Sequence, residues 1–400
     1  MPSVRDPIRP PSLTPAEARE LHYEALVIDA QQPPATSGFL FNDNMRAALA
    51  EMHERGVDRG IAGNRLARMA AREVQTNPEA VKDYVGLWKT SGVTIGAGTY
   101  IAGNRIEVAF EAAVKRIAEA RSMIDVLGGE VALILTADDI ERVYREGKHG
   151  VIIDFQDTIP FGTDIDRIDL FYNLGLRQVQ LTYNLRNLVG DGCTEHNASG
   201  VTYFGRTVVE RLNELNMIVD VSHCSEAVGW DAIELSTAPV IVSHSNAKAV
   251  TYHDRAKSDE LAKAIADQEG FFGVTIIPGF VQDESTAATL DHFVDHVVHL
   301  VNVMGLDHVG IGNDKCGPGG QTGSLVEYPD DMPDLPHGAF DWSGFRREHR
   351  VHDEYHNVDY QTFADWPLLT MALAKRGFNE DELRKLLGLN YLRVFRQIVG

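Results

Sequence analysis

The sequence is short of cysteine and of basic residues, and both shortages exclude classes of protein. Cys193, Cys224 and Cys316 are the three cysteines among 400 residues, and no Cys-x-x-Cys pair is present, so we expect no disulfide framework. Lys and Arg number 37 against 58 Asp and Glu, which gives a formal charge of -21. Such an acidic balance argues against nucleic acid and anionic membranes as partners.

Long apolar runs are also missing. No uncharged run is long enough to cross a bilayer, and the first residues carry neither the apolar stretch nor the cleavage pattern of a signal peptide, so we expect a cytoplasmic protein. A Gly-rich dinucleotide fingerprint is absent after the first expected strand, where Gln31-Gln32-Pro33-Pro34 stands instead. This absence disfavours an open, doubly wound sheet.

What is present is a regular alternation of short β-branched runs and helical patterns. Eight runs are predicted as strands, over residues 25–31, 93–100, 149–156, 177–183, 216–223, 239–244, 270–277 and 308–314. Eight alternating β and α units predict a (β/α)8 barrel of the TIM type, which places ligands at the C-terminal ends of its strands. The 44% hydrophobic content suffices for one large domain over residues 1–400, and the doubly wound sheet remains the alternative.

Several segments flank the barrel strands. After a lead over residues 1–24, in which Thr14 and Pro15 predict a capped helix start, residues 42–77 predict a helical elaboration. Helices are also expected over 107–124, from Thr136, and over 365–376 and 380–387, before a final segment, 388–395, that seals the barrel. The polar segment 317–360 is expected to be a lid or an interface loop. Its histidines, expected to be mostly solvated, are His337, His349, His352 and His356.

Two neighbouring strands end in the same way, in Ser-His followed by polar residues. The stretches are Ile218-Val219-Asp220-Val221-Ser222-His223 and Val240-Ile241-Val242-Ser243-His244. Because the ends of adjacent barrel strands lie together, we expect His223 and His244 to be neighbouring metal ligands. Asp314 follows the last strand and suits either ligation or proton abstraction. Further polar groups at strand ends are Gln31, Gln156, Asp157, Tyr183 and Asn184.

From residue 25 to residue 395 the chain resembles the membrane dipeptidase family (renal dipeptidase, peptidase family M19), a group of metal-dependent barrels related to the amidohydrolases. The resemblance is strongest after Asn173. Besides the two Ser-His stretches, it is carried by Gly175-Leu176-Arg177, Leu181-Thr182-Tyr183-Asn184, Thr202-Tyr203-Phe204-Gly205-Arg206, Asp307-His308-Val309-Gly310-Ile311-Gly312-Asn313-Asp314 and Asn390-Tyr391-Leu392-Arg393-Val394-Phe395.

The resemblance implies a site. Family members hold two zinc ions bridged by a glutamate and cleave dipeptides with a metal-bound hydroxide. His223 and His244 match the two histidines of one metal, and Asp314 matches the aspartate of the last strand. Arg255, in His253-Asp254-Arg255, matches the arginine that grips the substrate carboxylate, and bidentate recognition of this kind suits a guanidinium.

The departures from the family pattern concern the other metal. Gln31 and Pro33 stand where the family has His-x-Asp, Gln156 stands where it has the bridging glutamate, and Tyr183 replaces a histidine. An amide oxygen is a weak, neutral ligand and proline offers none, so we expect at most one divalent metal, with zinc as the ion that these ligands suit. Substitution of the lost ligands by Asp29, Asp154 or Asp157 is left open.

We therefore expect hydrolysis of an amide or peptide-like bond in a small carboxylate substrate, by a homodimer. Asp314 and Tyr183 are the expected catalytic residues, and the substrate is expected to contact Arg255, Tyr183 and Asn184. The expected metal ligands are His223, His244, Gln156 and Asp314. The lost charges leave two alternatives open: a lyase, isomerase or decarboxylase on the same barrel, or a binding barrel that has lost turnover.

Overall fold

The computed structural model describes residues 8–32, 39–101, 105–282, 287–315, 317, 325–333, 344–350 and 356–400. Its centre is a sheet in which eight strands follow one another in parallel. They are β1 (Ile28–Asp29), β2 (Ile95–Ile101), β4 (His149–Phe155), β5 (Leu176–Gln180), β6 (Ile218–Asp220), β7 (Val240–Ser245), β8 (Phe271–Val274) and β10 (Val309–Ile311).

Hydrogen bonds between the two ends of this sheet bring it round into a barrel. The amide of Ala30 donates to the carbonyl of Ile311 at 3.0 Å, and the amide of Asp314 donates to that of Gln31 at 2.9 Å. Each of the eight predicted strands overlaps one of the observed strands, so the predicted (β/α)8 barrel is confirmed and the doubly wound alternative is wrong.

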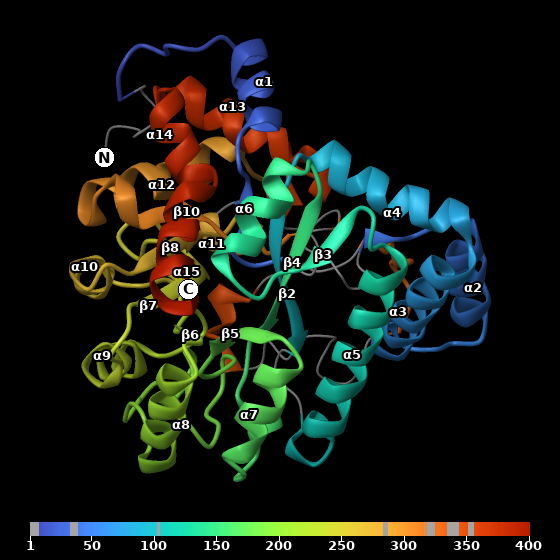
Figure 1. Cartoon of the computed structure of the whole chain (residues 1–400), viewed down its shortest axis with the longest axis horizontal. Coiled ribbons are helices and arrows are strands. Elements are labelled where there is room, and N and C mark those ends of the chain that lie inside the picture. The colour runs from blue at the N-terminus through green and yellow to red at the C-terminus, as the bar shows by residue number, and fades with distance from the viewer. Residues whose placement is uncertain are drawn as a thin grey trace.

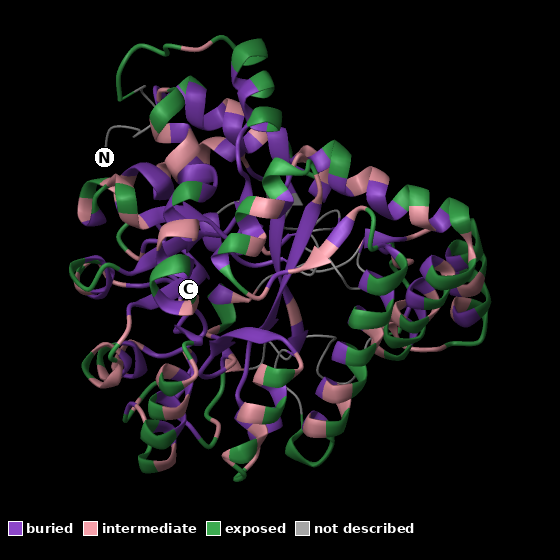
Figure 2. Ribbon diagram, in the orientation of Figure 1, coloured by how far each residue is buried: buried purple, intermediate pink, exposed green. Residues whose placement is uncertain are grey.

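Helices cover the outside of the barrel, and the strands lie buried inside them (Figures 1 and 2). Buried strand residues such as Val219 and Val242 point outward into the helix layer, while Ile218 and Ile241 point into the barrel, as period-two alternation requires. The surrounding helices are α5 (Ile106–Val126), α6 (Ala137–Arg145), α7 (Asp166–Asn173), α8 (Tyr203–Glu214), α9 (Glu226–Leu235), α10 (Asp259–Asp267), α12 (Leu290–Met304) and α13 (Trp366–Arg376).

The predicted N-terminal helices are also present. Helix α1 (Pro15–Glu24) begins with the predicted Thr14 cap, whose hydroxyl accepts from the amide of Glu17 while the Glu17 carboxylate accepts from the amide of Thr14. Helices α2 (Asp43–Glu54) and α3 (Arg59–Thr76) fill the predicted elaboration. Helix α4 (Pro78–Ser91), which the sequence analysis did not assign, continues this lobe at the side of the barrel (Figure 1).

Some short elements lie off the main path of the sheet. Strand β3 (Val131–Leu133) pairs with the first residues of β4, and the sequence analysis missed it because three residues give no periodicity. Strands β9 (Ala287–Ala288) and β11 (His356–Asn357) form a separate pair. The remaining short elements are α11 (Pro278–Val281) and single turns at Ile159–Phe161 (η2), Leu306–His308 (η3), Arg347–His349 (η5) and Phe363–Asp365 (η6).

The C-terminal segment closes the end of the barrel opposite to the strand C-termini, as predicted. After α14 (Glu380–Arg384) and a π-helical turn at Lys385–Leu389 (η7), helix α15 (Asn390–Val399) crosses this opening, in front in Figure 1. A Cβ on Gly388 would lie 2.2 Å from the carbonyl oxygen of Leu26, so the turn needs glycine there. The buried residues Tyr391, Val394, Phe395 and Ile398 share one apolar cluster with Leu26, Ile28, Ile95, Ile152, Ile218, Ile241 and Phe271.

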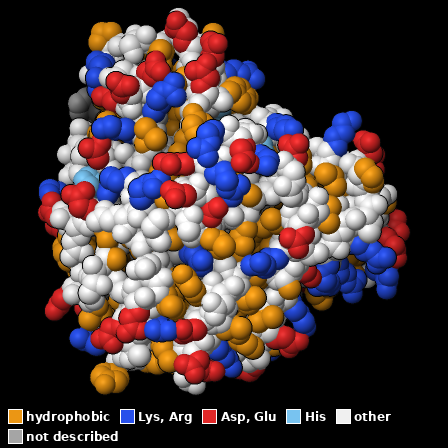
Figure 3. All heavy atoms as spheres, in the orientation of Figure 1, with side chains coloured by type: hydrophobic (Ala, Val, Ile, Leu, Met, Phe, Trp, Pro, Cys, Tyr) orange, Lys and Arg blue, Asp and Glu red, His pale blue; other side chains and the backbone are white. Residues whose placement is uncertain are grey.

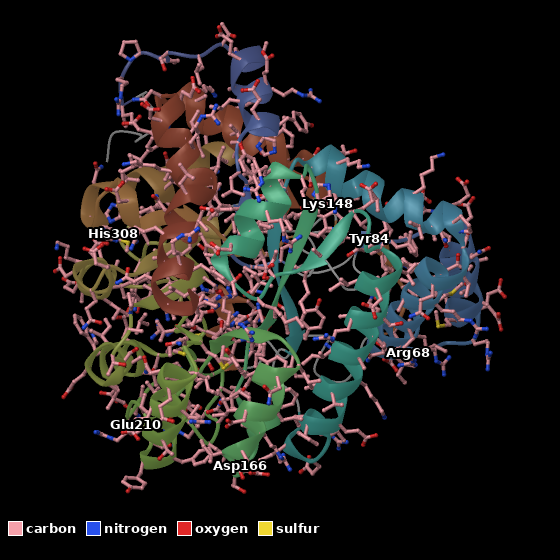
Figure 4. The ribbon with its side chains drawn as sticks, viewed as in Figure 1. Arg68, Tyr84, Lys148, Asp166, Glu210 and His308 are labelled. Carbon is pink, nitrogen blue, oxygen red and sulfur yellow. The ribbon has the colours of Figure 1, made fainter. Side chains whose placement is uncertain are left out.

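On the outer surface, side chains of both charge signs are interspersed. The face in Figure 3 carries basic and acidic groups side by side. Arg68, Asp166 and Glu210, labelled in Figure 4, are exposed residues of α3, α7 and α8. Over the ranges that the structure describes, no helix combines the length and the hydropathy that a bilayer crossing requires.

Candidate active site

His223 and His244 lie together at the C-terminal ends of β6 and β7. His223 follows the end of β6 by three residues and is 5% exposed. His244 is the penultimate residue of β7 and is fully buried. Their Nε2 atoms are 2.9 Å apart. The two Ser-His stretches therefore bring their imidazoles together, and the role of both rings as metal ligands stays a prediction.

The outer nitrogens of both rings have polar partners. His223 Nδ1 lies 2.6 Å from Asn184 Oδ1, and His244 Nδ1 lies 2.7 Å from Ser243 Oγ. Burial and the nearby Arg255 guanidinium hold the pKa of both histidines well below the usual value, so both rings are neutral. Two neutral rings whose Nε2 atoms face each other need either a proton or a cation between those atoms.

This pair fits one divalent metal. Two imidazole nitrogens on a tetrahedral zinc ion lie about 3.3 Å apart, so a slight opening of the 2.9 Å contact would seat the ion. Asp314 Oδ2 lies 3.8 Å from His244 Nε2, on the same side. No set of three His, Cys, Asp or Glu side chains is already gathered around one metal position in the described part of the chain, so a third ligand would have to move in.

Asp314 occupies an uncommon backbone conformation. Its φ of 58° is left-handed, which aspartate tolerates better than most residues, and the bond from its amide to the Gln31 carbonyl anchors it. Burial raises the pKa of Asp314 to about 7, and the Arg255 charge opposes this rise, while 22% of the side chain remains exposed. A carboxyl group with this pKa can accept or release a proton near neutrality.

Tyr183 and Asn184 follow β5 and contact His223 directly. The Tyr183 ring stacks on the imidazole of His223 with centroids 4.2 Å apart. Burial raises the pKa of the Tyr183 phenol well above its usual value, so its hydroxyl keeps its proton. Asn184, with a left-handed φ of 59°, directs its side-chain oxygen to His223 Nδ1. Asn184 therefore fixes the ring, and Tyr183 covers one face of it.

The Arg255 guanidinium bridges the backbone at the ends of β6 and β7 by hydrogen bonds. Its Nη1 donates to the carbonyl of Ser222 at 2.5 Å and its Nη2 to that of His244 at 3.0 Å, while Nε finds no hydrogen-bond partner among the described residues. The guanidinium is 1% exposed and lies 5.6 Å from the ring of Phe280. Two of its five donors thus hold the turns, and the Nε edge remains available to a carboxylate.

Comparison with known proteins supports the resemblance. Residues 65–335 match the membrane dipeptidase family (peptidase family M19). The chain belongs to the membrane dipeptidase family. Dipeptidase tcpJ of Claviceps purpurea (strain 20.1) is 30% identical over 264 residues, which cover 66% of this chain and 54% of that protein. Dipeptidase verJ of Clonostachys rogersoniana is 27% identical over 289 residues, 72% of this chain and 65% of that one. The chain thus spans about half the length of the first relative.

Solved structures share the fold. An amidohydrolase from Pseudomonas aeruginosa is 25% identical with a TM-score of 0.71, covering 97% of this chain and 100% of its own. A metallo peptidase from Rhodobacter sphaeroides, liganded with a phosphinate mimic of the dipeptide L-Ala-D-Ala, is 19% identical with a TM-score of 0.68, covering 94% and 99%. At the lower identity the likeness concerns the barrel alone.

On the side of the mouth where the family pattern has its other ligands, this barrel has neutral amides. Gln31 donates from Nε2 to Thr99 Oγ1, and its Oε1 accepts weakly from Ser243 Oγ at 3.4 Å. Gln156 is buried after β4, and its carbonyl accepts from Gln180 Nε2 at 2.6 Å. Pro33 lies outside the described residues. The side-chain amide of Gln31 is thus engaged with neighbouring polar groups, whereas the contact of Gln156 is made by its backbone carbonyl.

The three aspartates considered as substitute ligands are engaged elsewhere or neutral. Asp29 accepts from the amide of Asn313 at 2.8 Å and from Trp366 Nε1 at 3.2 Å. Asp157 accepts from Asn187 Nδ2 at 2.8 Å. Both oxygens of Asp154 are buried without a hydrogen-bond partner among the described residues, and burial raises the pKa of this carboxyl well above its usual value. These contacts favour structural roles for Asp29 and Asp157 and a protonated Asp154.

Sequence reasoning missed Lys257. Its ammonium is 1% exposed and donates to the carbonyl of Cys224 at 2.5 Å, directly after His223. Together with Arg255 it gives the buried surroundings of the two histidines a positive charge, and both cations contribute to their low pKa values. A lysine two residues after the matched arginine was the available signal, but lysine in a loop is usually solvated.

Residues 344–350, which we call the strap, contact His253 and Asp254, which precede Arg255 in the chain. His349 Nδ1 lies 3.0 Å from Asp254 Oδ2, and the carbonyl of His349 is 2.7 Å from His253 Nε2. At the other end, a Cβ on Gly344 would lie 2.8 Å from Leu185. The strap therefore bridges the loops after β5 and β7. His337 and His352, like Cys316, lie outside the described residues, and the side chain of His356 is not described.

Proposed function

We propose that the protein is a metal-dependent hydrolase that cleaves an amide or peptide-like bond in a small carboxylate substrate with a single divalent ion, zinc. The observation that carries this proposal is the 2.9 Å approach of two neutral imidazole nitrogens at the mouth of a barrel of the dipeptidase family. Two nitrogen ligands with a carboxylate within reach suit zinc.

The residues of the site would divide the work as follows. His223 and His244 would hold the metal, which would supply Lewis-acid chemistry and activation of water. The free Nε edge of Arg255 binds the substrate carboxylate side-on, because its Nη groups already donate to strand-end carbonyls. Asp314 takes up the proton of the attacking water, and its pKa near 7 matches that task. The Tyr183 hydroxyl keeps its proton and can donate a hydrogen bond to the substrate.

The neutral amides support a single ion. Without a carboxylate bridge, a second divalent cation beside the first would meet uncompensated repulsion and weak ligands at Gln31 and Gln156. A single ion held by His223 and His244 would have to supply both kinds of chemistry, carbonyl polarisation and water activation. We therefore expect slow turnover of ordinary L,L- and L,D-dipeptides compared with a two-metal dipeptidase.

The same amides favour a second candidate function. The lost charges are also what a barrel would show after its chemistry had moved to a lyase, isomerase or decarboxylase reaction, or after turnover had been lost. Metal content separates these cases, since a stoichiometric ion held by the two histidines supports hydrolysis and a protein that takes up no ion supports a binding barrel.

The test combines elemental analysis with a substrate panel. The panel pairs dipeptides and N-acyl amino acids with the same compounds in which the free carboxylate is amidated. We expect at most about one ion per chain, and turnover that depends on that ion and on the carboxylate. Two fully occupied sites, or efficient turnover of generic dipeptides, would contradict the single-ion proposal.

A further inference from the structure

The serines of the two Ser-His stretches are both bound to one buried carboxyl group. Asp220, at the end of β6 and fully buried, accepts at Oδ1 from the amide and the hydroxyl of Ser222 at 2.9 and 2.6 Å. The amide of Ser243 also reaches Oδ1, at 3.0 Å, and the Ser243 hydroxyl lies 2.5 Å from Oδ2. Asp220 therefore connects the turn that carries His223 with the turn that carries His244.

These contacts extend into an unbroken chain of four hydrogen-bond distances. The chain runs from Asp220 Oδ2 to Ser243 Oγ (2.5 Å), on to His244 Nδ1 (2.7 Å), from His244 Nε2 to His223 Nε2 (2.9 Å), and from His223 Nδ1 to Asn184 Oδ1 (2.6 Å). The amide oxygen of Asn184 can only accept, so neutral His223 carries its proton on Nδ1 and presents a lone pair at Nε2.

Without a metal, one arrangement of protons satisfies the whole chain. His244 must carry its proton on Nε2 to donate to His223, so its Nδ1 accepts from the Ser243 hydroxyl. The Ser243 oxygen then accepts from a protonated Asp220. Each of the four links has one donor and one acceptor, and Ser222 Oγ, which lies 2.9 Å from Ser243 Oγ, can donate to it as well.

With a metal on both Nε2 atoms, the arrangement must reverse. The His244 proton then sits on Nδ1 and is donated to Ser243, which donates in turn to an ionised Asp220. The metal-free chain contains four protons, on Asp220, Ser243, His244 and His223, and the metal-bound chain contains three. One proton is lost while both rings remain neutral.

We propose that Asp220 and Ser243 form a proton relay that switches the tautomer of His244 when a divalent metal binds: the Asp220 proton passes through Ser243 to His244 Nδ1, and the Nε2 proton of His244 is released, one for each ion taken up. This inference rests on the proposed metal site at His223 and His244. Asp220 and Ser243 are positioning residues here, since they act on the metal through His244. The proposed chemistry does not use the serines of the two Ser-His stretches. In the relay, Ser243 transfers protons and Ser222 donates hydrogen bonds to Asp220.

The surroundings of Asp220 are consistent with a carboxyl group that exists in both forms. Burial raises its pKa, and the four donors from Ser222 and Ser243 oppose the rise. Asp154 on β4 and Tyr391 on α15 are the titratable groups that face it within the barrel, Cys224 and Arg255 lie near its upper side, and Arg255 favours the ionised form. An incoming divalent cation adds to this positive field, which favours release of the proton.

The backbone of Ser243 is held too tightly to shift when the relay reverses. A Cβ on either Gly273 or Gly312 would lie 2.0 Å from the Ser243 carbonyl oxygen, so the neighbouring strands β8 and β10 pack directly against it. The reversal therefore needs only hydroxyl rotation and proton transfer, with no movement of heavy atoms beyond the opening of the two rings.

The first experiment reads the tautomer directly in the unaltered protein. Long-range proton–nitrogen NMR of the full chain labelled with nitrogen-15 at histidine separates Nδ1–H from Nε2–H rings, and His244→Gln identifies the signal. We expect His244 to be the Nε2–H form in the metal-free protein and the Nδ1–H form after addition of zinc. An Nδ1–H ring in both states would overturn the relay.

The second experiment counts protons. Calorimetric titration of zinc in buffers of different ionisation enthalpy gives the protons released per ion. We expect wild type to release about one proton more than Asp220→Asn, because the asparagine has none to give up, and this difference cancels any proton lost by metal-bound water. Asp220→Asn and Ser243→Ala should bind zinc roughly 10–100-fold more weakly.

Ser245→Ala is the matched control, since Ser245 is a buried serine of the same strand whose hydroxyl donates to the carbonyl of Arg255 at 2.7 Å, outside the relay. It should behave as wild type. Equal proton counts and equal affinities in wild type and Asp220→Asn would refute the relay. Failure of wild type to bind zinc at all would instead refute the proposed function, so the two failures are distinguishable.

Discussion

The two sides of the barrel mouth have the same fold but different chemistry. At the ends of β5, β6 and β7, two neutral imidazoles face each other, and Asn184 and Ser243 fix their outer nitrogens. At the ends of β1 and β4, the corresponding positions hold Gln31 and Gln156, which are buried amides. One side presents lone pairs that need a cation, and the other presents neutral side-chain amides.

This difference shows which features a metal site needs besides ligand atoms. The imidazole side has second contacts that orient each ring before any ion arrives, and burial together with the cations Arg255 and Lys257 lowers the pKa of both rings. On the amide side, the carboxyl of Asp154 on β4 has a pKa raised by burial. A single substitution is therefore not expected to restore a second ion.

The largest expected effect is the loss of metal binding when either histidine of the imidazole side is removed. His223→Ala and His244→Ala should each abolish metal binding, since one imidazole and a distant carboxylate hold zinc poorly. Gln156→Ala, on the amide side, should leave the metal content nearly unchanged. Elemental analysis of the three purified variants checks this. If both histidine variants kept their ion, the metal would lie elsewhere.

On the amide side, we expect Asp157 to make the free energy of unfolding depend on pH. Burial raises the pKa of Asp157 from 3.8 to about 6, so the folded state binds a proton more tightly than the unfolded state. The stability that this proton confers is fully present below pH 4 and is lost as the pH rises through 6, by up to about 3 kcal/mol.

Urea unfolding at several pH values should therefore show that Asp157→Asn removes this part of the loss. Asp164→Asn, at a carboxylate that is 56% exposed, is the control and should follow wild type. A variant whose stability still fell between pH 4 and 6 as steeply as wild type would show that Asp157 is not the group responsible.

On the imidazole side, Asp314→Asn tests the base. The change keeps the shape of the side chain and removes its proton acceptor, so kcat should fall by about 10²-fold or more while substrate affinity stays largely intact. Steady-state kinetics on the best substrate of the panel, with metal content measured in parallel, checks this. Near-full turnover with the ion retained would assign the proton to another group.

The smallest effect is expected at Arg255. Arg255→Lys keeps the charge but loses the fork, so carboxylate substrates should bind more weakly by roughly 1–3 kcal/mol. Substrates with an amidated carboxylate should be insensitive, which separates lost recognition from a disturbance of the Ser222 and His244 carbonyls that Arg255 also holds. Equal weakening of both substrate classes would mean that Arg255 acts on the turns alone.

The elements that the sequence predicts well are those whose signal is local. β-branched runs that end in polar residues mark the eight barrel strands, and the repeated Ser-His ending brings His223 and His244 together as expected. Capping patterns place the starts of α1 and α6. In each case the residues that determine the structure lie within a few positions of one another.

The parts that sequence reasoning misses depend on contacts between distant positions. Lys257 is a buried cation because it meets the carbonyl of Cys224, 33 positions earlier. The strap is ordered by Asp254, 95 positions before His349, as the bond from the Asp254 amide shows. From the sequence alone, Asp220 is an ordinary strand residue. Its role depends on the contact with Ser243, which lies on the next strand. Such roles follow from the assembled barrel and not from spacing.

Helix α15 has a consequence for how the protein is made. Synthesis proceeds from the N-terminus, so all eight strands leave the ribosome before the ten residues of this helix do. Until then the isoleucine-rich ring at the base of the barrel lacks Tyr391, Val394, Phe395 and Ile398, and the nascent chain carries an open apolar surface. A chain that terminates a few codons early would therefore be a client for chaperones and proteases, even though every residue of the mouth would be present.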